Sequence, residues 1–139
     1  MGGKEGQGSV EFMVAVSFVI LLFIAVTFLV MEREGENWSL KVFLDAKRVA
    51  GSMADNINTI AQQGVGYNRS FWMPSTLYGN IDYNLTVIEG DVEIRWLESS
   101  WGKKLITDNV TLINMTKGGM NCVANTANGV FVDTRCPDV

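Results

Sequence analysis

The sequence contains no histidine among its 139 residues, and only two prolines and two cysteines. Histidine is the commonest general base and metal ligand in proteins, so its absence argues against an enzyme and against a metal site. The serines and carboxylates that are present do not form a recognisable nucleophile motif. We therefore expect no catalytic residue, no metal and no cofactor.

Clusters of positive charge are also missing. From Glu32 onward the chain has ten lysines and arginines against thirteen aspartates and glutamates, and no run of basic residues. Nucleic-acid binding needs a basic patch or stripe, so no nucleic-acid partner is expected.

Charge of either sign is absent from the twenty residues between Phe12 and Met31, where only Ser17 and Thr27 are polar. As a helix this stretch would be about 30 Å long, which matches the hydrocarbon core of a bilayer. Lys4 precedes it and acidic residues follow, which favours an N-terminus in the cytoplasm. No small-x-small cleavage site follows the stretch. The simplest interpretation is a single uncleaved membrane anchor with an exterior domain.

The residues just before this stretch add a second interpretation. They read Gly6-Gln7-Gly-Ser9-Val-Glu11-Phe12. This string resembles the class III signal peptide of archaeal type IV pilin-like proteins, in which a leader is cut before a Gln-x-Ser-x-Glu pattern. The resemblance covers about the first thirty residues. It implies cleavage between Gly6 and Gln7 by a prepilin peptidase, with residues 1–6 as the leader.

The resemblance also implies a role in assembly and register for Gln7, Ser9, Glu11 and Phe12. Cleavage would leave an ammonium on Gln7, and the Glu11 carboxylate of a neighbouring subunit could meet it within an apolar bundle of helices. Two charges that are each costly to bury become tolerable as a pair. The alternative is that Glu11 only stabilises the first turn of its helix, where acidic side chains are favoured.

The pattern along the chain predicts an α+β fold, with a helix over about 8–62, roughly 80 Å long, and a small antiparallel sheet packed on its second half. Residues 7–34 would form the membrane or filament-core part, and 35–139 the exterior domain, with an amphipathic helix at 37–62 and a sheet within 65–139. The glycines at 64 and 66 predict the end of the helix. The expected buried stripe consists of Leu40, Phe43, Leu44, Ala46, Ala50, Met53, Ala54, Ile57 and Ile60.

Three segments read as strands. Alternating residues on both sides of Glu89-Gly90-Asp91 predict a hairpin. Residues 103–116 and 128–134 are rich in β-branched side chains. We expect about four strands in one sheet, and we expect the aromatic segment 67–80 to supply core side chains and a connection.

Cys122 and Cys136 both fall in the predicted exterior domain. A disulfide between them would close a loop of about fifteen residues and stabilise the domain by about 3 kcal/mol. Two buried thiols are the alternative. A metal site is disfavoured because no histidine is available, and an exported location favours the disulfide.

Five Asn-x-Ser/Thr sequons lie after the apolar stretch and predict N-glycosylation of the exterior. Asn109 and Asn114 are five residues apart, so on a regular strand they would face opposite ways and at least one would be buried. The five acceptors are Asn37, Asn68, Asn84, Asn109 and Asn114.

Together these features predict a structural subunit of an extracellular filament that is inserted in the cytoplasmic membrane before assembly and serves adhesion. By the resemblance, its partners are further copies of itself, the prepilin peptidase and the pilus assembly machinery. The alternative is a minor pilin or a single-pass surface glycoprotein that binds a ligand through its β domain.

Overall fold

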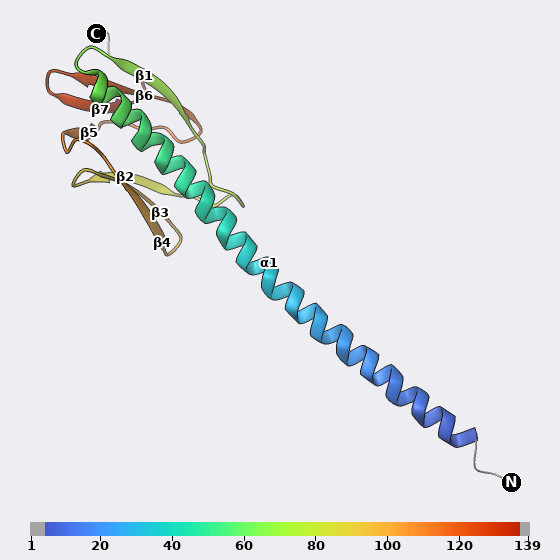
Figure 1. Cartoon of the computed structure of the whole chain (residues 1–139). Helices are drawn as coiled ribbons and strands as arrows, with labels where there is room; N and C mark the ends of the chain where they lie inside the picture. The colour runs from blue at the N-terminus through green and yellow to red at the C-terminus, as the bar shows by residue number, and fades with distance from the viewer. Residues whose placement is uncertain (1–4, 137–139) are drawn as a thin grey trace. The chain divides into compact units, whose positions relative to one another are not determined.

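The structure is a computed structural model that describes residues 5–136. The chain divides into two compact units, Met1–Leu40 and Lys41–Val139. One helix, α1 (Glu5–Gln63), supplies the first unit and the beginning of the second. The strands that follow it all belong to the second unit (Figure 1). The predicted α+β fold with a long N-terminal helix is confirmed.

The helix ends where the sequence predicts. Its last residue is Gln63, and the next two glycines, Gly64 and Gly66, have φ values of +92° and +96°. Glycine adopts this left-handed conformation at little cost, and it commonly ends a helix there. The chain then turns back, and the Gly66 amide donates to the Asn125 carbonyl at 2.9 Å.

The strands form two sheets where one was expected. The first is mixed and has the order β1-β6-β7-β5, with β5 and β7 parallel. The second is an antiparallel meander of β2, β3 and β4. The strands are β1 (Asn68–Met73), β2 (Asn84–Ile88), β3 (Asp91–Trp96), β4 (Ser99–Lys104), β5 (Val110–Leu112), β6 (Gly119–Thr126) and β7 (Gly129–Asp133).

The hairpin predicted around Glu89-Gly90 is confirmed. Ile88 of β2 pairs with Asp91 of β3, so the loop has two residues. Both have positive φ, +52° for Glu89 and +80° for Gly90, as a type I′ turn requires. A Cβ on Gly90 would come within 2.1 Å of the Asp108 carboxylate, so this position also needs glycine for space.

Strands β1, β4 and β6 were not expected. Strand β1 lies in the segment that was expected to supply core side chains and a connection. Its Phe71 and Met73 are buried, as expected, but the segment also pairs with β6 along its whole length. Strand β6 contains glycine and asparagine, which have low strand propensity. It is a strand because it lies between β1 and β7 and its backbone pairs on both sides.

The core of the second unit forms between the helix and both sheets. The buried helix residues are Val42, Ala46, Val49, Ala50, Met53, Ala54, Ile57 and Ile60, and side chains from β1, β2, β3, β6 and β7 complete the cluster. The predicted stripe is wrong at its start, because Leu40, Phe43 and Leu44 are exposed. Val42 and Val49, which the prediction omitted, carry the three- and four-residue spacing instead.

Candidate functional site

The predicted processing and assembly residues all lie in the first turns of α1. Gly6, Gln7 and Ser9 are helical, and their side chains fall outside the part of the chain that the structure describes, as do residues 1–4 of the predicted leader. The Glu11 side chain is exposed, and Phe12 is 68% exposed.

Glu11 has no partner within the described chain. None of the ion pairs among residues 5–136 involves its carboxylate. The helix begins at Glu5, so Glu11 lies beyond the first turn, where the attraction of the helix dipole for an acidic side chain falls off. The helix-end interpretation of Glu11 stays a prediction, as does its pairing with a neighbouring subunit.

The apolar stretch exposes its large side chains on every side. Each valine, leucine, isoleucine, methionine and phenylalanine between Val10 and Met31 is exposed. The two polar residues return their hydrogen bonds to the helix itself: the Ser17 hydroxyl donates to the Met13 carbonyl and the Thr27 hydroxyl to the Phe23 carbonyl, both at 2.8 Å. No polar group of these two side chains needs water.

By length and composition, α1 is apolar enough to cross a membrane, and it is the one such helix in residues 5–136. An all-round apolar helix is suited to lipid or to the centre of a helical bundle.

All five sequon asparagines are exposed. The expectation that Asn109 or Asn114 would be buried is wrong, because β5 covers only Val110–Leu112 and both asparagines lie just outside it. Asn109 differs from the others in having a structural role. Its Nδ2 donates to the Asn128 carbonyl at 3.2 Å, and its carboxamide lies against Gly129, where a Cβ would come within 2.6 Å of it.

We expect sugar on exported protein at no more than four of the five sequons, because the Nδ2 atom that would carry the glycan at Asn109 holds the β6–β7 turn. Asn→Gln substitution at Asn37, Asn68, Asn84 and Asn114 should increase gel mobility wherever a glycan is lost. Asn109→Gln should leave mobility unchanged and lower the free energy of unfolding by about 1 kcal/mol. A mobility shift for Asn109→Gln would contradict the assignment.

The two cysteines form a disulfide that starts from β6, an interior strand of the mixed sheet. The Sγ atoms of Cys122 and Cys136 are 1.95 Å apart and their Cα atoms 5.2 Å apart, and no cysteine is free. The bridge ties the segment after β7 back to the middle of β6. This is the pairing that an exported domain would be expected to contain.

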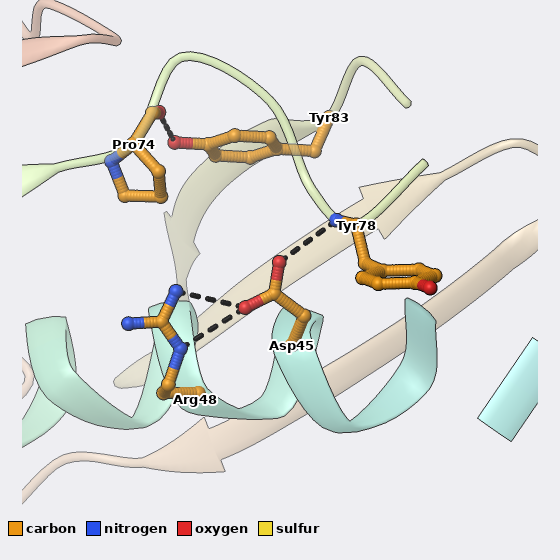
Figure 2. A network of polar contacts seen from close by, with 5 residues as sticks. All are labelled: Asp45, Arg48, Pro74, Tyr78 and Tyr83. Carbon is orange, nitrogen blue, oxygen red and sulfur yellow. Dashed lines mark hydrogen bonds and ion pairs between the residues drawn. The ribbon is translucent and has the colours of Figure 1, made fainter. Parts of the chain in front are cut away.

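A polar network that the sequence did not suggest attaches the segment between β1 and β2 to the helix (Figure 2). The Asp45 carboxylate accepts from the Tyr78 backbone amide at 2.8 Å through one oxygen. Its other oxygen accepts from Arg48 Nε and Nη2 at 3.0 and 2.8 Å. Farther along the same segment, the Tyr83 hydroxyl donates to the Pro74 carbonyl.

The Tyr83 ring is buried, with 3% of its surface exposed. Burial raises the pKa of its phenol from 10.0 to about 12, and the carboxylates of Asp82 and Asp45 add to the effect. The neutral phenol is therefore favoured by folding.

This shift predicts alkaline instability with a defined window. The stabilising contribution of neutral Tyr83 is complete below about pH 10 and is lost as the pH rises to about 12. We expect the free energy of unfolding to fall across this window by at most about 3 kcal/mol. Urea titrations of the full chain in detergent, followed by near-UV circular dichroism, would measure it. Tyr83→Phe should flatten this pH dependence. Tyr67→Phe, at an exposed position, should leave it as it is. Equal pH dependence in the two variants would refute the assignment of the effect to Tyr83.

Residues 5–136 contain no group of three or more cysteine, aspartate or glutamate side chains placed to hold a metal ion. Comparison of the chain with protein-family models, curated proteins and solved structures finds no match.

Proposed function

We propose that this chain is the structural subunit of an archaeal type IV pilus-like filament, held in the cytoplasmic membrane until assembly. The observation that carries the proposal is the combination at the start of α1: an exposed, unpaired carboxylate at Glu11, directly followed by a helix that is apolar on every side. Resemblance of residues 6–12 to the class III processing site supports the same function.

The mechanism follows from burial of the helix. Before assembly, lipid covers the side chains from Val10 to Met31. In the filament, the same side chains would pack against the helices of neighbouring subunits, so one apolar environment replaces another. Such an exchange gains little hydrophobic energy, and the proposed assembly machinery would have to drive it.

Glu11 would fix the axial position of each subunit. Cleavage after Gly6 would make Gln7 the N-terminal residue, and its ammonium would be the nearest cation on the N-terminal side of the apolar stretch. When the Glu11 carboxylate of one subunit meets this ammonium on the next, both charges are neutralised in the apolar bundle. A helix shifted by one turn would leave both charges buried without a partner, so the pair selects one register.

The test is the N-terminal residue of the protein recovered from cells. Surface filaments are sheared off and their subunits analysed by mass spectrometry. A mature N-terminus at Gln7 in the filament fraction is the expected result. A chain that starts at Met1 or Gly2 and occurs only in membranes would overturn the proposal and leave a membrane-anchored surface protein.

A further inference from the structure

An open groove of about 550 Å³ lies beside the helix within the second unit. The helix contributes Lys47, Arg48 and Gly51 to it, and more polar residues as far as Thr59; the strands contribute Arg69 from β1 and Trp101 and Lys103 from β4. Its volume falls within the roughly 300–1,000 Å³ that is usual for small-molecule sites.

The groove is positively charged in a chain whose formal net charge is −4. Four of the lining side chains are cationic and one, Asp55, is acidic. Asp55 pairs with Lys103 at 2.6 Å, and Arg48 pairs with Asp45 at 2.8 Å. Among the described residues, Lys47 and Arg69 have no ion-pair partner. These two cations, one on the helix and one on β1, are left to bind an anion.

The rest of the lining suits a sugar better than a simple anion. Trp101 presents a large, partly buried ring, and Lys47 Nζ lies 5.8 Å from its centroid. Asn56 donates to the Ser52 carbonyl at 2.7 Å, and its Oδ1 remains as an acceptor. An aromatic face beside amide and hydroxyl groups can cover the apolar face of a pyranose and bond its hydroxyls.

Gly51 provides a separate reason to expect a ligand. Glycine is less favourable than alanine inside a helix, yet Gly51 lies near the middle of the part of α1 that belongs to the second unit. A Cβ added there would meet no atom within 4 Å, so packing within the chain does not require glycine. An approaching ligand would explain why the space above the helix is kept open.

We propose that this groove binds a saccharide that carries a carboxylate, of the uronic acid type. Arg69 and Lys47 bind the carboxylate, Trp101 covers a sugar ring, and Gly51 leaves room for it beside the helix. An inorganic anion would need the cations alone, and a nucleic acid would need a longer basic surface than the groove offers. The groove lies within the second unit, so binding there does not depend on filament assembly.

The binding test uses the full chain in detergent micelles and titration calorimetry at low salt. The probe is trigalacturonate, and maltotriose serves as the neutral sugar of the same length. We expect trigalacturonate to bind at least about tenfold more tightly than maltotriose, and its affinity to fall as salt screens the two cations. If sodium sulfate, at equal ionic strength, competes for the groove as well as trigalacturonate does, the groove is a general anion site and the proposal is overturned. The absence of any binding heat would overturn it too.

Variants locate the site. Arg69→Gln keeps the Asn68 sequon and should weaken trigalacturonate binding about tenfold or more. Lys104→Gln also removes one positive charge. Lys104 follows Lys103 but lies on the opposite face of β4, so this variant should leave binding unchanged. Gly51→Ala should raise thermal stability through better helix propensity and still weaken binding. Equal losses for Arg69→Gln and Lys104→Gln, or unchanged binding in Gly51→Ala, would refute the site.

Discussion

Replacing Glu11 with alanine is expected to reduce filament assembly at least about a hundredfold, while the protein continues to insert into the membrane. In the proposed filament the substitution leaves the Gln7 ammonium of a neighbouring subunit buried without its partner. Removing one member of a buried ion pair costs about 3–5 kcal/mol, which corresponds to a factor of a hundred or more in an equilibrium constant. Filament yield after shearing, measured against the amount of protein in membranes, gives the result.

Two further variants separate charge from shape and position. Glu11→Gln keeps the size of the side chain and removes only the charge, so it should also fail to assemble. Glu32→Ala removes an exposed carboxylate at the other end of the apolar stretch and should assemble normally. Normal filaments from Glu11→Ala would remove the pairing role, even if processing at Gln7 were intact.

Replacing Ile57 with alanine is expected to lower the free energy of unfolding of the second unit by about 2–5 kcal/mol. Ile57 is fully buried in the core formed by the helix and both sheets. Truncating it removes apolar contacts and leaves a cavity that the surrounding strands can only partly fill. Because small domains are stable by only about 5–15 kcal/mol, the variant should unfold at a clearly lower urea concentration.

Leu44→Ala is the matched control. It removes a side chain of the same size from the same helix, at a position that is 53% exposed. We expect a change within about 0.5 kcal/mol, as for most surface substitutions. Equal destabilisation by the two variants would mean that the domain packs against a different face of the helix.

The helix and the β2–β3 hairpin could be predicted from sequence because their signals are local. The helix is indicated by an uncharged run and by the absence of proline. Its end is indicated by the two glycines Gly64 and Gly66. The hairpin follows from alternation around a turn whose Gly90 accepts positive φ. Each signal lies within a few residues of the structure that it predicts.

The mixed sheet and the start of the buried stripe depend on contacts that are distant in sequence. Strand β6 has weak propensity and forms through pairing with β1 and β7. Phe43 and Leu44 have the right spacing for a core position, but the strands lie over the face defined by Val42 and Val49. Helical periodicity indicates that a stripe exists, and tertiary packing decides which of two adjacent stripes is covered.

The groove could not be predicted because its residues come from three separate elements. Arg69, Trp101 and the helix residues around Gly51 are far apart in the sequence and belong to β1, β4 and α1. Only Gly51 carried a local signal, as a glycine within a helical pattern.

The pairing of β1 with β6 has a consequence for the rate and order of folding. Strand β1 ends at Met73 and its partner β6 begins at Gly119, with the whole β2–β4 meander between them. The meander can form early from local contacts, whereas the mixed sheet must wait for the last quarter of the chain. During the proposed export, a partly translocated chain would hold an unpaired β1, with Phe71 and Met73, which are buried in the folded unit, exposed beside an uncovered helix stripe. Such intermediates are prone to aggregate. If the domain is exported as proposed, it can complete the mixed sheet only after its C-terminal strands have crossed the membrane.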